Sequence, residues 1–210
     1  VVPVREATSA DVAATMAPDI PRAVQLAHQI VTERFDAVYL LGMGGSSLCA
    51  EVLRAVNGIA AGHPELYVLD TTDEQTITSA AARLDPARTL FLVASKSGGT
   101  VEVASLERFF WAQVTAAEGS AAGRHFVAIT DPGTALQALA ESKRYRDVFV
   151  NPADIGGRFS ALSLFGLVPT ALIGASAAEL HAAGAAMADG CRQENHTNPG
   201  LMLGAFIGAA

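Results

Sequence analysis

A short polar run directly after an apolar stretch has the composition of a phosphate-binding loop. Residues 95–100 read SKSGGT and follow the apolar residues 90–94. The hydroxyls of Ser95, Ser97 and Thr100 are compact hydrogen-bond donors, and the two glycines leave backbone N–H groups accessible. A helix is expected to begin here, and its N-terminus adds a partial positive charge. This combination suits a phosphate dianion.

A second glycine-rich run, GMGGSSL at residues 42–48, follows an earlier apolar stretch. Gly44 and Gly45 let the backbone approach a ligand closely, and Ser46 or Ser47 is expected to cap the following helix. Both runs also fit a plain interpretation, because glycine and serine make tight turns and helix caps without a ligand. One cap does not require six consecutive small or donor residues, so residues 95–100 favour anion binding.

The run at residues 42–48 also fits the glycine fingerprint of dinucleotide-binding folds. Ser47 stands where that fingerprint has its third glycine or alanine, and Asp70 ends the next apolar run as a ribose-binding acid does. A dinucleotide has no need of the hydroxyl-rich run at residues 95–100. A monophosphate therefore fits the two loops better, and a nicotinamide-binding domain is the alternative.

A third run, IGGRFSALS at residues 155–163, places an arginine after two glycines. Gly156 and Gly157 leave Arg158 free to reach inward. Because an arginine side chain keeps its charge, it can stabilise a developing oxyanion or bind an acid. An ion pair with a neighbouring carboxylate is the competing interpretation.

The elements that position these runs follow an α/β pattern. Apolar runs alternate with helical segments, at residues 37–43, 65–70, 89–95, 125–130 and 147–152. Their apolar residues are consecutive, which is typical of parallel strands covered by helices on both faces. We expect a doubly wound, flavodoxin-like sheet of five parallel strands, with ligands beyond the carboxyl ends of the strands. Further helices are expected at residues 19–35, 160–174, 177–191 and 199–210.

Composition argues against several classes of protein. The 210 residues carry a formal charge of -7, which disfavours a general nucleic-acid or anionic-membrane surface. Cys49 and Cys191 lie far apart and suggest neither a disulfide framework nor a zinc site, so a cytoplasmic setting is the default. The uncharged run 159–178 is long enough to span a bilayer, but Pro169 and its serines favour a buried helix.

Together the three runs resemble the phosphoglucose isomerase family, which has the sugar isomerase (SIS) fold. The resemblance extends from about residue 35 to the end of the chain, with GMGGSSL, SKSGGT and IGGRFSALSLFGLVP in family order. The first and third runs look closest to the isomerase part of bacterial transaldolase and phosphoglucose isomerase fusions. Ser47, Gly98 and Gly99 depart from the commoner family pattern, which shifts phosphate binding toward backbone N–H groups.

The resemblance implies that residues 35–175 form an SIS domain that binds a sugar phosphate. Residues 1–34 would be an N-terminal helical segment, and residues 176–210 would be helices leading toward a second SIS subdomain beyond this chain. The resemblance also implies a homodimer for the full-length protein.

The implied reaction converts glucose 6-phosphate to fructose 6-phosphate through an enediolate, without a metal or an organic cofactor. Arg158 would be the catalytic residue that stabilises the enediolate. Ser95, Ser97 and Thr100 would hold the phosphate. The other residues implied to bind substrate are the main chain of Lys96 and, around the sugar, Gly45, Ser46 and Gly157.

The family also uses a carboxylate base, and a histidine and a lysine around ring opening, and the sequence identifies no residue for these three roles. Glu194 and His196 lie in a polar run before the last expected helix and are interpreted as loop residues. We expect the base in the second subdomain, so this chain would bind substrate and catalyse poorly on its own. A non-catalytic sugar-phosphate sensor is the alternative from another functional class.

Overall fold

A computed structural model of the chain describes Val12 and residues 15–209. Within these residues lies one sheet of five strands, β1 (Ala37–Gly42), β2 (Glu65–Leu69), β3 (Thr89–Ala94), β4 (Phe126–Thr130) and β5 (Asp147–Val150). Their order is β2-β1-β3-β4-β5, and every neighbouring pair is parallel. Each strand falls within the apolar run that predicted it. The parallel sheet and its flavodoxin-like order are therefore confirmed.

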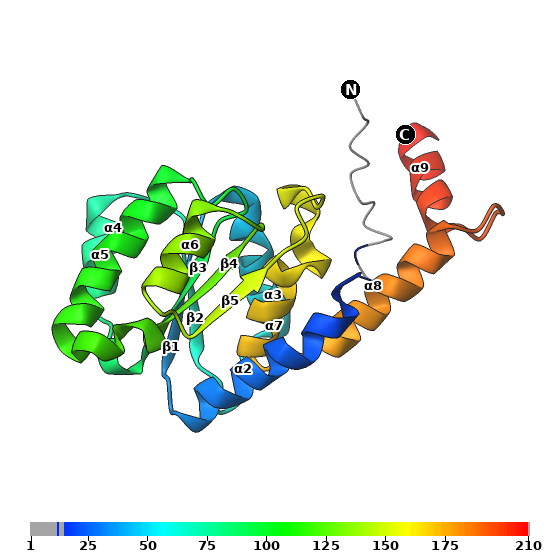
Figure 1. The fold of residues 1–210 in the computed structure, drawn as a ribbon. Coiled ribbons are helices and arrows are strands. Elements are labelled where there is room, and N and C mark those ends of the chain that lie inside the picture. Colours follow the sequence, from blue (N-terminus) through cyan, green and yellow to red (C-terminus); the bar gives the residue numbers. More distant parts are fainter. Residues whose placement is uncertain (1–11, 13–14, 210) are drawn as a thin grey trace.

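Helices cover both faces of the sheet, as Figure 1 shows. One face carries α2 (Ile20–Thr32), α3 (Leu48–Asn57) and α7 (Leu164–Leu172). The other face carries α4 (Glu74–Ala81), α5 (Val101–Glu118) and α6 (Ala135–Ser142).

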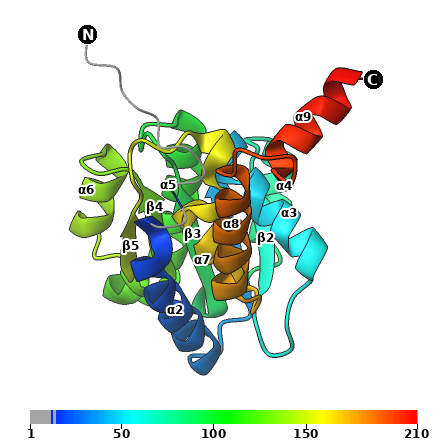
Figure 2. The same cartoon turned by 90° about the vertical axis from the view of Figure 1, so that its right-hand side faces the viewer.

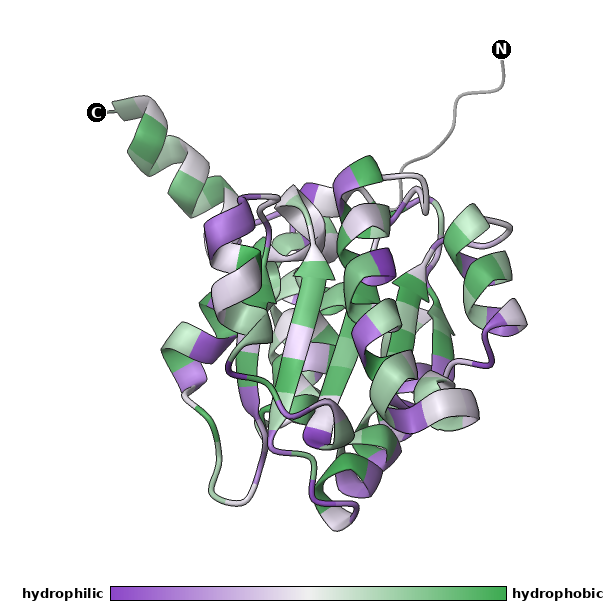
Figure 3. Ribbon diagram, turned by 90° about the vertical axis from the view of Figure 1, so that its left-hand side faces the viewer, coloured by the Kyte–Doolittle hydropathy of each residue, from purple (hydrophilic) through white to green (hydrophobic). Residues whose placement is uncertain are grey.

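The two layers explain the consecutive apolar residues of the strands, because alternate residues enter different cores. In β1, Val38 and Leu40 belong to one buried cluster, while Tyr39 and Leu41 belong to the other. Figure 3 shows the strands in mostly hydrophobic colours, behind helices of mixed character.

Short 3-10 helices occur in the connections, namely η1 (Ala17–Asp19), η2 (Gly44–Ser46), η3 (Pro86–Arg88), η4 (Gly119–His125) and η5 (Gly157–Leu162). The helix expected over residues 160–174 is divided, because η5 ends at Leu162 and α7 begins at Leu164. Ser163 between them has an extended backbone, and its hydroxyl accepts a hydrogen bond from the N–H of Phe165. This serine therefore starts a new helix instead of continuing the previous one.

α7 is buried along its whole length, as the sequence predicted for this uncharged run. Gly166 is required there, because a Cβ atom would lie 2.0 Å from the carbonyl oxygen of Ala161. Among residues 15–209, no helix combines the length and the hydropathy needed to cross a bilayer.

The last two helices are α8 (Ala177–Cys191) and α9 (Pro199–Ala209), close to the expected bounds. α8 packs against α7 and α2, whereas α9 extends away from the rest of the structure, as Figure 1 and Figure 2 show. Large apolar side chains of α9 are 60–74% exposed, namely Leu201, Met202, Leu203, Phe206 and Ile207. The proposed role of residues 176–210 as a connection to a second subdomain stays a prediction.

Candidate functional site

The first two runs, residues 42–48 and 95–100, begin side by side at the carboxyl ends of the strands. β1 and β3 are neighbours, and Gly42 at the end of β1 pairs with Ala94 at the end of β3. The helices that follow, α3 and α5, lie on opposite faces of the sheet. Such a divergence opens a crevice at the carboxyl ends of the strands, where ligands bind in open α/β sheets.

The loop after β3 holds its hydroxyls at different depths. Ser95 is buried, and its hydroxyl lies 3.0 Å from the hydroxyl of Thr100. Ser97 is exposed, and its hydroxyl oxygen accepts a hydrogen bond from the N–H of Gly99 at 3.3 Å. The proton of the Ser97 hydroxyl therefore stays available for a ligand.

The start of α5 lies next to these hydroxyls. Thr100 occupies the N-cap position, but its side chain makes no capping hydrogen bond. The first N–H groups of this 18-residue helix thus keep their capacity to donate, and they carry the positive end of the helix dipole. Hydroxyls, uncapped N–H groups and a helix N-terminus together can bind a phosphate.

Gly98 fixes the shape of this loop. Its φ of +63° lies in the left-handed region, and a Cβ atom there would lie 2.5 Å from the Cβ atom of Thr134. A side chain at this position would meet both backbone strain and a steric clash.

Lys96 joins three loops through its side chain. Its ammonium group donates to Asp131 Oδ2 at 2.7 Å, after β4, and to the carbonyl of Ala153 at 2.9 Å, after β5. Its own carbonyl accepts a hydrogen bond from the N–H of Asp131 at 3.1 Å. Sequence reasoning missed Asp131, although the Asp-Pro-Gly turn at the end of the fourth apolar run was a usable signal.

The glycine loop after β1 (residues 42–48) contacts the arginine segment (residues 155–163). A Cβ atom on Gly45 would lie 2.5 Å from the carbonyl oxygen of Gly157, so glycine is required here by a close approach of two backbone segments. The hydroxyl of Ser160 donates to the carbonyls of both Gly45 and Gly157, at 3.1 and 2.7 Å. Sequence reasoning assigned the close approach at Gly45 to a ligand and missed this partner within the chain.

The expected serine cap of α3 is wrong. Ser47 occupies the N-cap position, but its hydroxyl donates to the carbonyl of Gly44 at 3.1 Å and caps no N–H group. Gly44 has a φ of +56°, which turns its carbonyl within reach of that hydroxyl. Ser46 is the last residue of η2 and is half-buried.

Arg158 lies in η5, beside the contact between Gly45 and Gly157. Its side chain is exposed and makes no hydrogen bond or ion pair with the described residues. The competing interpretation, a structural ion pair, therefore finds no partner for Arg158 within residues 15–209. A free guanidinium at this place can bind an oxyanion.

The structure thus brings the three runs to one edge of the sheet. Gly45 and Gly157 join the first run to the third, and Lys96 joins the second to the segment before the third. Within residues 15–209, no group of three or more histidine, cysteine, aspartate or glutamate side chains is placed to hold a metal ion.

Comparison with known proteins gives matches over most of the chain. A profile of the family described as phosphoglucose isomerase matches residues 28–208. The glucose-6-phosphate isomerase of Carboxydothermus hydrogenoformans is 34% identical over 175 residues, covering 79% of this chain and 38% of that relative. A glucose-6-phosphate isomerase of Thermus thermophilus is 37% identical over 140 residues, covering 65% of this chain and 32% of that relative.

Two solved structures share the fold. The crystal structure of glucose-6-phosphate isomerase from Chlamydia trachomatis has a TM-score of 0.70 and 25% identity, covering 83% of this chain and 33% of that one. The crystal structure of a hypothetical protein from Thermus thermophilus has a TM-score of 0.80 and 29% identity, covering 91% of this chain and 47% of that one.

The chain spans less than half the length of these relatives. All three runs lie inside the residues that the family profile matches. The chain belongs to the phosphoglucose isomerase family.

Proposed function

We propose that this chain holds the phosphate and the sugar of a hexose phosphate in an enzyme that interconverts glucose 6-phosphate and fructose 6-phosphate. One observation carries the proposal. The phosphate loop (residues 95–100), the glycine loop (residues 42–48) and Arg158 meet at the carboxyl end of the sheet. The names of the relatives support the choice of substrate and reaction.

The phosphate lies, in this proposal, at the N-terminus of α5. Ser97 and Thr100 donate hydrogen bonds from their hydroxyls, and the N–H groups of Lys96 and the first turn of α5 complete the site. Ser95 is 2% exposed, so we assign it an indirect role. Its hydroxyl orients that of Thr100 at 3.0 Å.

The sugar extends from the phosphate toward η2 and η5, where Gly45, Ser46 and Gly157 line it. Removal of the proton from C2 of the open-chain aldose places negative charge on the oxygen at C1. Arg158 lowers the free energy of this enediolate with its charged donors. Transfer of the hydroxyl proton from O2 to O1 and return of the first proton to C1 then give the ketose.

The base that moves the proton comes from other residues. None of the runs 42–48, 95–100 and 155–163 contains an aspartate, a glutamate or a histidine. We therefore propose that the chain alone binds hexose phosphates but turns them over far more slowly than an enzyme that holds the base.

The phosphate site is tested by calorimetry on the 210-residue chain, with glucose 6-phosphate and with glucose. We expect binding of the phosphate ester and none of glucose. Ser97→Ala and Thr100→Ala should each weaken binding by about 1–3 kcal/mol, because each removes a hydrogen bond to a charged group.

Ser105→Ala is the matched control for these variants. Its hydroxyl lies on α5 and donates to the carbonyl of Val101 at 2.8 Å, so its loss should leave the affinity unchanged. An unchanged affinity in both Ser97→Ala and Thr100→Ala would remove the phosphate assignment.

The role of Arg158 is tested with an enediolate analogue, a sugar-phosphate hydroxamate. Because Arg158 acts on charge that develops during the reaction, Arg158→Ala should weaken the analogue at least about tenfold more than it weakens glucose 6-phosphate. Arg108→Ala, an exposed arginine on α5, should affect neither ligand. Equal losses for the two ligands would contradict an isomerase role and favour a sugar-phosphate sensor.

A further inference from the structure

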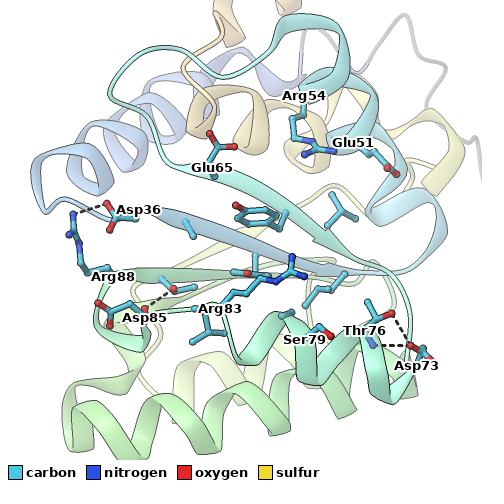
Figure 4. A pocket seen from close by; sticks show the side chains of 18 of the residues that line it. Asp36, Glu51, Arg54, Glu65, Asp73, Thr76, Ser79, Arg83, Asp85 and Arg88 are labelled. Atoms are coloured by element: carbon cyan, nitrogen blue, oxygen red, sulfur yellow. Dashed lines mark hydrogen bonds and ion pairs between the residues drawn. The ribbon is translucent and has the colours of Figure 1, made fainter.

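A cavity of about 810 Å³ opens beside the edge strand β2. α3 forms one wall, and α4 with the segment that follows it forms the other, as Figure 4 shows. The lining includes none of the residues assigned above to the sugar phosphate. The volume falls within the range of roughly 300–1,000 Å³ that holds small-molecule ligands.

Several charged side chains around the cavity already have partners. Arg88 forms an ion pair with Asp36 at 2.6 Å. Asp73 and Asp85 accept hydrogen bonds from backbone N–H groups at the starts of α4 and η3. These four side chains are occupied by the fold and are not available to a ligand.

Two arginines on opposite walls have no such partner. Arg54 from α3 and Arg83 from the segment after α4 make no hydrogen bond or ion pair with the described residues. Figure 4 shows them reaching toward the cavity from opposite sides of β2. The Nε atom of Arg54 is buried and has no acceptor, whereas the two terminal nitrogens of its guanidinium are not buried and can be reached by an anion in the cavity.

An aromatic surface lies beside these cations. The rings of Tyr39 and Tyr67 stack with their centroids 4.9 Å apart, and Tyr67 is 42% exposed. Burial and the neighbouring Tyr67 raise the pKa of Tyr39, and the positive charge of Arg83 acts in the opposite direction. Arg83 therefore lies close to the stacked rings, so an anion on Arg83 places the rest of a ligand over them.

Two exposed acids complete the rim. Glu51 from α3 and Glu65 from β2 line the cavity, and their side chains accept no hydrogen bond from the described residues. A purely anionic ligand would be repelled by them, whereas N–H and O–H groups of a ligand would find acceptors there. The complete set is two cationic donors, a flat ring surface and two acceptors.

We propose that this cavity binds a mononucleotide. Its phosphate lies between Arg54 and Arg83, its base lies on Tyr67, and its amino and hydroxyl groups donate to Glu51 and Glu65. An inorganic anion would satisfy the arginines but would leave the ring surface and most of the volume unfilled. The site is separate from the sugar-phosphate loops and does not depend on the isomerase assignment.

The proposal is tested by titrating the ¹⁵N-labelled chain with AMP, followed by NMR. We expect shifts of the amide signals of residues 65–69 and 79–84, with adenosine and inorganic phosphate each binding more weakly than AMP. Arg54→Gln and Arg83→Gln should each weaken AMP at least about tenfold, because each loses a charge-assisted hydrogen bond. Arg83 is exposed, so its variant should fold even if the Arg54 variant does not.

Two controls separate this site from the phosphate loop. Arg108→Gln removes an exposed arginine of α5 and should leave AMP binding unchanged, and so should Ser97→Ala. Amide signals of residues 65–69 that do not respond to AMP would overturn the proposal. So would an AMP response that survives in Arg83→Gln but is lost in Ser97→Ala, because it would place the nucleotide at the phosphate loop.

Discussion

His125 shows how the sheet accommodates a titratable side chain in its interior. Its Nδ1–H donates to the carbonyl of Thr89 at 3.0 Å, and its ring is fully buried beside Phe35. Nε2 has no hydrogen-bond partner among the described residues, with Glu118 3.7 Å away. Burial lowers the pKa of this imidazole, although the hydrogen bond to Thr89 opposes the change. The folded chain therefore favours the neutral ring.

This environment predicts a loss of stability in mild acid. As the pH falls through about 6.5, the unfolded chain binds a proton at His125 more readily than the folded chain does. The free energy of unfolding therefore falls with the pH until the imidazole of the folded chain is protonated as well. His125→Asn keeps a donor for Thr89 and cannot titrate. Urea unfolding between about pH 5 and pH 6.5 should therefore show a shallower loss for this variant, by at most about 1.4 kcal/mol per pH unit.

His196→Asn serves as the control, because His196 is exposed in the loop between α8 and α9. Its removal should leave the slope of stability against pH unchanged. An unaltered slope in His125→Asn would show that His125 does not control the response.

The residue types of the proposed phosphate site can be read from the sequence, but their contacts cannot. Hydroxyls and glycines after an apolar run indicate a phosphate loop wherever a parallel strand ends. The burial of Ser95 and the bond from Lys96 to Asp131 depend on a strand 35 residues further along. A local sequence pattern does not reveal contacts between residues that lie so far apart in the sequence.

The contact between η2 and η5 is the feature that aligns the glycine loop with the arginine segment. Gly45 allows it, because the carbonyl oxygen of Gly157 occupies the space of a Cβ atom at this position. Ser160 then bridges the two short helices through both carbonyls. The position of Arg158 beside the glycine loop depends on this close approach.

Gly45→Ala is therefore expected to destabilise the chain and to displace η5. A Cβ atom 2.5 Å from the carbonyl oxygen of Gly157 forces the backbones apart, at a cost of about 1–3 kcal/mol. Thermal unfolding measures the loss. Gly99→Ala is the comparison, because a Cβ atom there has only the carbonyl oxygen of Ser97 within reach, at 4.0 Å. Equal stability of the two variants would contradict the steric argument.

The strands were easier to predict than the short helices around the site. Strands buried on both faces leave runs of consecutive apolar residues, and that signal gave all of the described strands. The division of residues 157–172 at Ser163 was missed, because the run after Arg158 carries no charge and a single serine cap carries little weight in such a pattern. The domain boundary at residue 35 stays a prediction, although α2 shares a core with the strands.

The chain as a whole presents an uncovered apolar helix, α9, among residues 15–209. α9 lies away from the other helices, and Phe206 and Ile207 are 74% and 65% exposed. Exposed apolar patches of this kind promote association in water. The homodimer that the family resemblance implies remains a prediction.

We expect the 210-residue chain to self-associate through α9 as its concentration rises. Sedimentation velocity should show a larger monomer fraction for Phe206→Ser with Ile207→Ser than for the unaltered chain. Val24→Ser, an exposed apolar residue of α2, should leave the distribution unchanged. A chain that stays monomeric at every concentration would contradict this expectation.

The bridge from Ser160 to Gly45 spans 115 positions of the sequence, so its two ends leave the ribosome at different times. Residues 42–48 are complete long before residues 155–163 are added. The two segments can therefore meet only after β5 has emerged and docked. The junction that the proposed function places around the sugar thus forms last in the maturation of the chain.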